Sequence, residues 1–146
     1  MALQTQAKDL SARVLTSIHE ALFVMSKGRF GGKAFGMPVL RLTTIGRKSG
    51  QPRTTMLTSP VQDNGNVVLV ASYGGDDRHP KWFLNLRDNP DVQVMMGGQD
   101  RAMRARVAEP DEKSALWPRL TAAYKGYAQY QTKTDRDIPV VILEPR

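Results

Sequence analysis

The sequence predicts a mainly β fold of the α+β class: a small antiparallel β-barrel of about six strands with helices packed outside it. Six short runs have the composition of strands, and several connections between them are short and marked by glycine, as in hairpins. Strands and helices do not alternate regularly, which disfavours a Rossmann or P-loop fold. The chain has 146 residues, of which 40% are hydrophobic, so we expect a single domain over residues 1–146 with its own core.

The first predicted element is an N-terminal amphipathic helix over residues 8–27, followed by a glycine-containing loop. Its apolar side chains recur every three to four residues, at Leu10, Val14, Ile18, Leu22 and Met25. Such a helix usually packs on its own domain, but an apolar face followed by a basic loop is also typical of a peripheral membrane helix. No apolar run there can span a bilayer and no secretory signal is evident, so we expect a cytoplasmic protein, with weak peripheral membrane contact as the alternative.

Three strands are predicted next, over residues 39–45, 53–59 and 66–71. The first two are β-prone and flank a tight turn. The Asp-Asn-Gly run at 63–65 is a strong hairpin signal ahead of the third strand, which is apolar throughout and should be buried on both faces. Because the connections are this short, we expect the three strands to form an antiparallel meander.

The second half of the sequence predicts two further helices and three strands. The helices cover residues 81–87 and 110–124, and the strands cover residues 91–96, 101–108 and 139–143. Pro80 suits the start of the first of these helices, and Asn89 and Pro90 stop it. The second has acidic residues in its first turn, which favours the helix dipole. Its expected buried face consists of Ala115, Leu116, Leu120 and Ala123.

The formal net charge of +7 is concentrated in one segment of the chain. Residues 21–61 contain seven basic residues and no acidic one, whereas the rest of the chain holds 14 basic and 14 acidic side chains. The seven are Lys27, Arg29, Lys33, Arg41, Arg47, Lys48 and Arg53. A segment of this kind indicates an anionic partner (a cofactor, a lipid surface or a nucleic acid) or else a solvated basic face.

The turn between the first two strands is the most informative part of the chain. Arg47, Lys48 and Arg53 place three positive charges around it, and Gly46 and Gly50 allow backbone angles that a side chain disfavours. Consecutive backbone N–H groups in such a turn can converge into an anion-binding concavity. The surrounding residues do not fit the phosphate-binding P-loop, because a strand rather than a helix follows. We therefore predict a site for the phosphate or carboxylate of a small ligand.

The helix predicted over 81–87 combines core residues with two candidate site residues. Phe83, Leu84 and Leu86 are expected in the core. Trp82 and Asn85 lie three residues apart, so both could face one cavity.

Tyr124, Tyr127 and Tyr130 follow one another at intervals of three, which on one helix would form an aromatic stripe with three hydroxyl groups. Such a stripe is either part of the core or the wall of a pocket for a flat ligand, and a pocket would supply polar partners for three phenols. The chain has no cysteine and two histidines, so neither a disulfide nor a transition-metal site is expected. Redox chemistry would then need an organic cofactor.

A set of short motifs follows a specific order between residues 39 and 146. They are L-x-T-x-G-R-K-S-G-x-x-R over 42–53, V-A-S at 70–72, G-G at 74–75, H-P-x-W-x-x-N-L over 79–86, N-P at 89–90, Y-x-G-Y-x-x-Y over 124–130, Q-x-x-T-x-R over 131–136 and I-P-V at 138–140. With these motifs the chain resembles the deazaflavin-dependent nitroreductase family of actinobacteria, which includes quinone reductases. The resemblance implies a split β-barrel and coenzyme F420, an 8-hydroxy-5-deazaflavin with a polyglutamate tail, as cofactor.

The resemblance also implies roles for individual residues. The phosphate and the acidic tail of the cofactor would be held by Arg47, Lys48, Ser49 and Arg53. The deazaflavin ring would be lined by Thr54, Thr55, Met56, Leu57, Thr58, Val70, Ala71, Ser72 and Tyr73, and bordered by Lys81, Trp82, Asn85 and Tyr127. The catalytic contacts on the substrate side would come from Tyr124, Tyr127, Tyr130 and Ser72.

The activity that the resemblance implies is hydride transfer from the reduced deazaflavin to an electron-poor planar acceptor. The family's acceptors are quinones, enone lactones or coumarins such as aflatoxin, and nitro-aromatic compounds. Thr58 and Ser59 stand where some relatives have a tyrosine, which favours quinone or enone reduction over nitroimidazole activation.

Three other functions are alternatives to an F420-dependent reductase: an FMN-dependent oxidoreductase, an F420 carrier and a nucleic-acid-binding protein. An oxidoreductase of the same fold that binds flavin mononucleotide (FMN) would need fewer basic residues, and a non-catalytic F420 carrier would not need the tyrosines. No nucleic-acid partner is expected, because the strands over 39–59 lack the aromatic residues on which bases stack. Both a monomer and a homodimer are compatible with the sequence.

Overall fold

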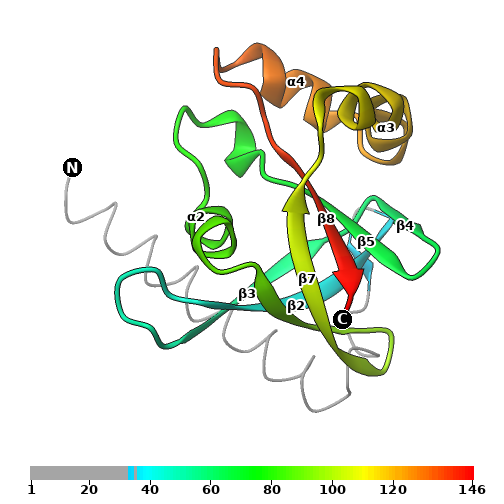
Figure 1. Cartoon of the computed structure of the whole chain (residues 1–146). Helices are drawn as coiled ribbons and strands as arrows, with labels where there is room; N and C mark the ends of the chain where they lie inside the picture. Colours follow the sequence, from blue (N-terminus) through cyan, green and yellow to red (C-terminus); the bar gives the residue numbers. More distant parts are fainter. Residues whose placement is uncertain (1–32, 35) are drawn as a thin grey trace, which may run out of the picture.

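The computed structural model describes residues 33, 34 and 36–146 and shows a mainly β fold built on one curved antiparallel sheet (Figure 1). The eight described strands are β1 (Lys33–Ala34), β2 (Met37–Ile45), β3 (Pro52–Thr58), β4 (Val61–Asp63), β5 (Asn66–Val70), β6 (Asp91–Met96), β7 (Gln99–Val107) and β8 (Val140–Pro145). The helix predicted over 8–27 lies outside the described residues. All six predicted strands are confirmed; β1 and β4, of two and three residues, are too short to give a periodic signal.

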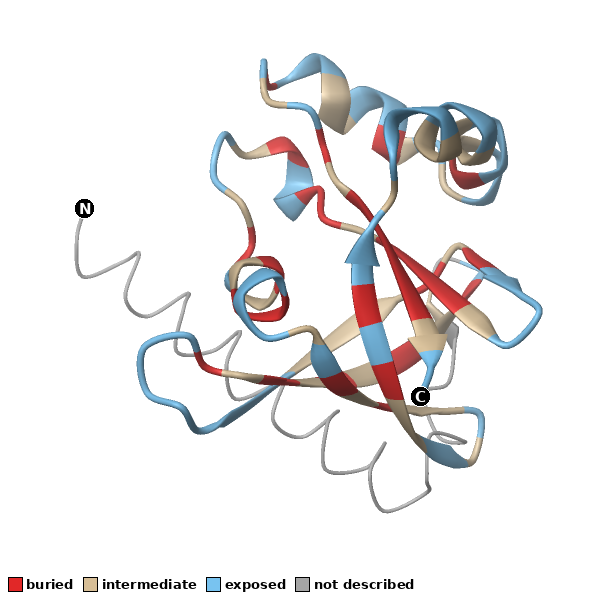
Figure 2. Ribbon diagram, in the orientation of Figure 1, coloured by how far each residue is buried: buried red, intermediate tan, exposed pale blue. Residues whose placement is uncertain are grey.

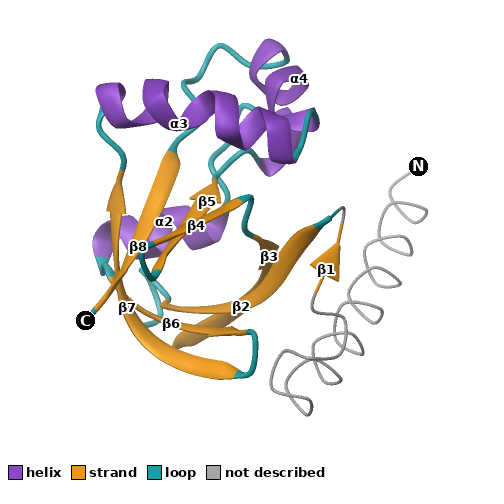
Figure 3. Cartoon of the chain, turned by 90° about the vertical axis from the view of Figure 1, so that its right-hand side faces the viewer, coloured by secondary structure: helices purple, strands orange, loops and turns teal. Residues whose placement is uncertain are grey.

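The strands follow the order β1-β2-β6-β7-β8-β5-β4, and β3 pairs with β2 beside this path. Within the described residues the sheet is open, because β3 pairs with β2 alone and β4 with β5 alone. The sheet is therefore an antiparallel half-barrel, which confirms the mainly β, antiparallel fold expected from the sequence without closing a barrel among these residues. Figure 3 shows its curvature, with β2, β6 and β7 wrapping around one side.

The predicted three-stranded meander is wrong, because β5 pairs with β4 and β8 and not with β3. The chain turns away at Ser59, whose amide donates to the Pro38 carbonyl beside the β2–β3 ladder. The buried Ser59 hydroxyl contacts the carbonyl oxygens of Val61 (3.0 Å) and Val68 (2.7 Å), which holds the β4–β5 hairpin at this corner. The hairpin itself was predicted correctly: Asn64 and Gly65 both have positive φ, as a two-residue turn requires.

Within residues 36–146 three α-helices pack on the sheet: α2 (Lys81–Asp88), α3 (Pro110–Ala123) and α4 (Gly126–Thr132). Figures 1 and 3 show α2 against the sheet and α3 with α4 together over one end of it. The helices predicted over 81–87 and 110–124 are confirmed, whereas α4 was not predicted as a separate helix. The expected buried face of α3 is only half right: Leu120 is buried and Leu116 half-buried, but Ala115 and Ala123 are exposed.

The hydrophobic core formed by the described part of the chain has two parts. One joins Phe83 and Leu86 of α2 to Leu40 and Leu42 of β2, and all four side chains are at most 3% exposed. The other lies under α3 and α4 and includes Leu120 and Tyr127. Figure 2 shows buried and exposed residues alternating along β7, as expected where one face of a sheet is covered. The space between α2, β3 and the tyrosines of the second cluster contains the candidate site.

Candidate functional site

Two adjoining cavities lie beside β3 and the N-terminal end of α2. The first has a volume of about 610 Å³ and is named the basic cavity. It is lined by Thr44, Gly46, Arg47, Lys48, Ser49, Arg53, Thr54, Thr55, Leu57, Tyr73, Pro80, Lys81, Trp82 and Asn85. The second, of about 460 Å³, is named the aromatic cavity. It is lined by Ala34, Met37, Val39, Met56, Leu57, Thr58, Val70, Ser72, Tyr73, Gly74, Pro80, Trp82, Tyr124, Tyr127 and Tyr130.

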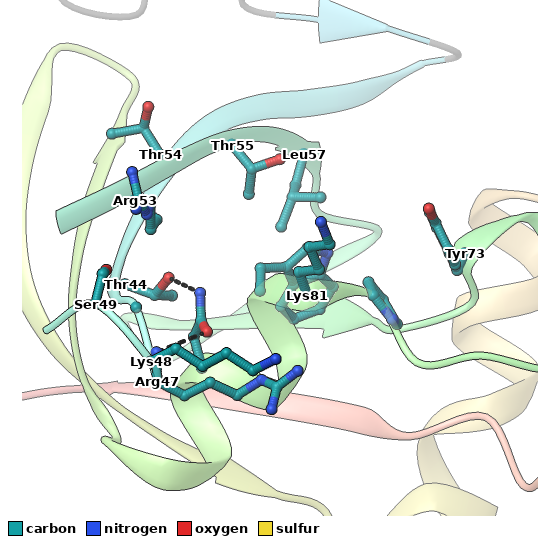
Figure 4. A pocket seen from close by; sticks show the side chains of 14 residues that line it. Thr44, Arg47, Lys48, Ser49, Arg53, Thr54, Thr55, Leu57, Tyr73 and Lys81 are labelled. Carbon is teal, nitrogen blue, oxygen red and sulfur yellow. Dashed lines mark hydrogen bonds between the residues drawn. The ribbon is translucent and has the colours of Figure 1, made fainter. Parts of the chain in front are cut away.

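The basic cavity collects cations from three elements and has no acidic residue among its described lining residues. Arg47 and Lys48 come from the β2–β3 turn, Arg53 from β3 and Lys81 from the start of α2. Figure 4 shows the side chains of Arg47 and Lys48 extending next to one another, with Arg53 across the cavity from them. Three of the seven basic residues of the predicted segment, Arg47, Lys48 and Arg53, are thus brought to one site together with Lys81, whereas Arg41 is not among the lining residues. This charge suits a ligand carrying several negative charges.

The backbone of the β2–β3 turn is closed by its own hydrogen bonds. The amides of Gly46 and Gly50 donate to the carbonyls of Gln51 and Gly46, both at 2.8 Å, and the Gln51 amide donates to the Ser49 hydroxyl at 3.2 Å. Gly50 has a φ of 70°, which explains the glycine. The predicted concavity of converging backbone amides is therefore wrong for these amides, which are already used inside the turn. The cationic side chains around the turn offer further donors for an anion.

Asn85 of α2 ties this turn to the helix. Its side-chain carbonyl accepts a hydrogen bond from the Arg47 amide (3.1 Å), and its amide group donates to the Thr44 hydroxyl (3.1 Å) (Figure 4). Asn85 is 8% exposed and Thr44 1%, so both hydrogen bonds satisfy buried polar groups. Trp82 and Asn85 both line the basic cavity, which confirms that they face one cavity. The sequence did not reveal that Asn85 also holds the turn.

The aromatic cavity contains no charged residue among its described lining residues. Its walls are methionine, aliphatic and aromatic side chains, with hydroxyl groups from Thr58, Ser72 and the tyrosines. Tyr127 is 5% exposed, and its hydroxyl contacts the sulfur of Met37 at 3.7 Å. Burial raises the pKa of Tyr127 to about 12, against a hydrogen bond with Thr58 that lowers it. At neutral pH this phenol is protonated and a weak acid.

The three tyrosines form a cluster, not a stripe on one helix as the spacing predicted. Tyr124 ends α3, while Tyr127 and Tyr130 belong to α4. The break between the helices comes at Tyr124 and Lys125, and α4 begins at Gly126, where a Cβ atom would lie 2.7 Å from the Tyr124 ring. The hydroxyls of Tyr124 and Tyr130 lie 2.9 Å apart, and this hydrogen bond, followed by burial, raises the pKa of Tyr124. Both residues are half-buried, so this pair is more accessible than Tyr127.

The two cavities share a wall formed by Leu57, Tyr73, Pro80 and Trp82. A ligand can therefore reach from the cations of the basic cavity to the tyrosines along one continuous surface. All predicted site residues line one or both cavities except Ala71. Ala71 is fully buried in the core, its amide donates to Pro139 and its carbonyl accepts from Arg136.

His79 does not line either cavity and lies against Phe83 (ring centroids 4.8 Å apart) and Arg136. Burial, and then the charges of Arg136 and Arg87, hold the pKa of His79 below its ordinary value of 6.5. Since the unfolded chain then binds the proton more tightly, the contribution of His79 to stability is complete above pH of about 6.5 and is lost as the pH falls below it.

We expect the free energy of unfolding, measured in urea, to fall less between pH 7 and 5 in His79→Asn than in the wild type. Equal decreases would contradict this assignment.

A curved antiparallel sheet with a polycationic cavity opening onto an aromatic one defines a binding domain for an elongated ligand with an anionic end and a flat end. The model of the F420H(2)-dependent quinone reductase family matches residues 15–145, and the chain belongs to that family. The F420H(2)-dependent quinone reductase Rv1261c of Mycobacterium tuberculosis is 38% identical over 136 residues, which cover 90% of this chain and 91% of the relative. A second protein of that organism, Rv3178, is 42% identical over 110 residues, 75% of this chain and 92% of its own.

Solved structures support the same assignment. An F420-H2 dependent reductase (FDR-A) has a TM-score of 0.67 at 44% identity, covering 73% of this chain and 94% of its own. Another structure, described as a domain-swapped dimer, has a TM-score of 0.68 at 36% identity and covers 97% of this chain and 98% of its own. The family resemblance recognised in the sequence is thereby confirmed.

Proposed function

We propose that this protein is a split-barrel oxidoreductase that uses reduced coenzyme F420 to reduce a quinone. The observation that carries the proposal is the continuity of the two cavities: a basic one without acidic lining residues and an uncharged aromatic one share four wall residues. A deazaflavin with a phosphate and several carboxylates in its tail has the same distribution of charge, since one end is polyanionic and the other is a flat ring. A ligand with a single phosphate would leave most of the cations without a partner.

The residues present fit this cofactor by their chemistry. Arg47, Lys48 and Arg53 would hold the phosphate and carboxylates, because guanidinium and ammonium groups form strong charge-assisted hydrogen bonds with both. Trp82 and Leu57 belong to both cavities and would border the ring. When bound, coenzyme F420 supplies a hydride from carbon 5 of its reduced ring. The contribution of the chain is to bind both reactants, to orient them and to exclude water from the space between them.

The acceptor would occupy the aromatic cavity, where it meets apolar walls and hydroxyl donors but no charge. An uncharged, planar quinone fits this lining, and its carbonyl oxygens could accept hydrogen bonds from the Tyr124–Tyr130 pair. Tyr127 would serve the site through its ring, because its hydroxyl is buried and its pKa is about 12. Enone lactones share the planar shape and the carbonyl group, so they are a second class of acceptor to test.

Two further expectations concern partners and location. A relative that forms a domain-swapped dimer makes a homodimer a reasonable alternative to a monomer for this chain. No helix among the described residues is long and apolar enough to cross a bilayer. A peripheral contact through the helix predicted over 8–27 would bring the protein to lipid-dissolved quinones, and it stays a prediction.

The proposal is tested by mixing the purified protein with reduced F420 and the soluble quinone menadione without oxygen. We expect oxidised F420 to form at a rate proportional to protein concentration. Titration with F420 should quench the intrinsic tryptophan fluorescence, to which Trp82 beside both cavities and Trp117 of α3 contribute, with a Kd of about micromolar. Reduced FMN in place of reduced F420 should support no turnover. Preference for FMN would overturn the choice of cofactor, whereas binding of neither would overturn the proposed function.

A further inference from the structure

Arg136, in the segment between α4 and β8, holds one loop through four contacts. Its Nε donates to the carbonyl of Asp76 (2.8 Å), and its two Nη atoms donate to the carbonyls of Ala71 (3.1 Å) and Ser72 (2.7 Å). Its Nη1 also lies 3.3 Å from Nδ1 of His79. All four partners belong to residues 71–79, so this loop wraps around a single guanidinium group. A planar group with five fixed N–H donors is suited to bridge several carbonyls at once, and a lysine is not.

The loop held in this way has an unusual backbone. Tyr73, Gly74 and Gly75 follow one another with φ values of 48°, 65° and 83°. A positive φ is unfavourable for tyrosine, and such a conformation persists only where the surrounding structure enforces it. Arg136 binds the carbonyl just before this run, at Ser72, and the carbonyl just after it, at Asp76. It therefore fixes the strained segment from both ends.

The same segment forms part of the reaction site. Ser72, Tyr73 and Gly74 line the aromatic cavity, and Tyr73 also lines the basic one. Its far side packs tightly on α4, since a Cβ atom at Gly75 would lie 2.9 Å from the carbonyl of Tyr130. The distance between the Tyr73 wall and the tyrosine cluster thus depends on how the loop sits on α4. Arg136 is hydrogen-bonded to this loop although it lines neither cavity.

We propose that Arg136 is a positioning residue: by fixing residues 71–76 it sets the width and orientation of the aromatic cavity, and so the alignment of the acceptor with the cofactor. The inference rests on the proposed function for its catalytic consequence, but the clamp itself is a property of the fold. Small displacements of a reactant are costly, because a shift of about 1 Å can lower a rate on the order of a hundredfold.

The test compares Arg136→Lys with the wild type. The variant keeps the positive charge but cannot bridge three carbonyls, so we expect kcat/KM for menadione to fall on the order of tenfold or more. The Kd for F420 should change less than about threefold, because the cations that hold the acidic tail are untouched. Guanidinium chloride at millimolar concentration should restore part of the activity of Arg136→Ala. If Arg136 contributed only to overall stability, guanidinium would not restore activity, and kcat/KM for menadione would not fall while the Kd for F420 stays nearly unchanged.

The matched control is Arg106→Lys. Arg106 is also a multiply bonded arginine, joined to Glu112 (2.7 Å) and Glu144 (2.9 Å), but it lies outside both cavities. We expect this control to keep the wild-type kcat/KM even if its melting temperature falls. If Arg136→Lys is folded and has kcat/KM within twofold of the wild type, the positioning role is wrong.

Hydrogen exchange separates this inference from the proposed function. The amides of Gly75 and Asp76 donate to the carbonyls of Ser72 and Tyr73 within the loop. In Arg136→Lys, without any ligand, exchange in residues 71–79 should become faster while exchange in β5 and β8 stays unchanged. Unchanged exchange in the loop would overturn the clamp. If the wild type does not oxidise reduced F420, the proposed function fails, and faster exchange would still support the clamp.

Discussion

Replacing both Arg47 and Lys48 with alanine is expected to raise the Kd for coenzyme F420 on the order of 30- to 100-fold. Both side chains are exposed at the mouth of the basic cavity, and none of the hydrogen bonds or ion pairs found among the described residues uses either of them. Their removal therefore takes donors from the ligand without breaking the fold. Removing two charge-assisted hydrogen bonds at a partly solvated site corresponds to about 2 to 3 kcal/mol of binding free energy. Fluorescence titration of each variant measures the effect.

The double substitution lowers the formal net charge of +7 by two, so a control must do the same elsewhere. The control Arg104→Ala/Arg119→Ala also removes two positive charges, at exposed residues that line neither cavity. Arg119 forms an ion pair with Asp63, which is exposed and therefore contributes little to stability. We expect the control to bind F420 within about threefold of the wild type. The affinity of the wild type should fall with added salt more steeply than that of Arg47→Ala/Lys48→Ala. Equal weakening in both double variants would mean that general charge attraction, not the basic cavity, binds the tail.

Much of this site could be predicted from the sequence because the patterns that indicate it involve residues close together in the chain. Charge, glycine and strand propensity all lie within the turn that carries Arg47 and Lys48, and the three-residue spacing of Trp82 and Asn85 places both on one side of a short helix. The hairpins at Asn-Gly and Gly-Gly were also predicted correctly, because turn positions with a positive φ favour glycine and asparagine. No local sequence pattern of this kind shows which distant strands pair with one another. The ladder of β2 with β6 joins residues about fifty positions apart, so the meander was a reasonable but wrong expectation.

The errors in the site have a common physical cause: a residue's partner cannot be read from its own neighbours in sequence. Ala71 follows a strand end and looks like a wall residue, but its backbone is used by Pro139 and Arg136. In the sequence Arg136 stands out only as part of a family motif, because its carbonyl partners lie 60 or more positions away. Tyr127 was expected on the substrate side, and that role stays a prediction; its spacing from Tyr124 and Tyr130 gave no sign of the burial that raises its pKa to about 12.

Asn85→Leu is expected to lower the free energy of unfolding by about 2 to 3 kcal/mol and to weaken F420 binding about tenfold. Leucine has a similar size, but it cannot accept from the Arg47 amide or donate to the Thr44 hydroxyl, both of which Asn85 contacts at 3.1 Å. A buried polar group without its partner costs more than the hydrogen bond contributed. The turn that carries Arg47 would then lose its attachment to α2. Urea denaturation and F420 titration measure the two effects separately.

The variant Thr44→Val tests whether the stability lost in Asn85→Leu comes from the unpaired Thr44 hydroxyl. If the Thr44 hydroxyl is stranded in Asn85→Leu, then adding Thr44→Val should cost little in that background, because both partners of one hydrogen bond are then apolar. Asn89→Ala, just after α2, serves as the control: Asn89 is exposed and its side chain accepts one exposed hydrogen bond from the Asp91 amide (3.3 Å), so its loss should cost no more than about 1 kcal/mol. A loss of stability in Asn85→Leu without any change in F420 affinity would show that Asn85 belongs to the core alone. A parallel loss of both would show that the position of the basic turn, and not only its charge, determines how the cofactor is held.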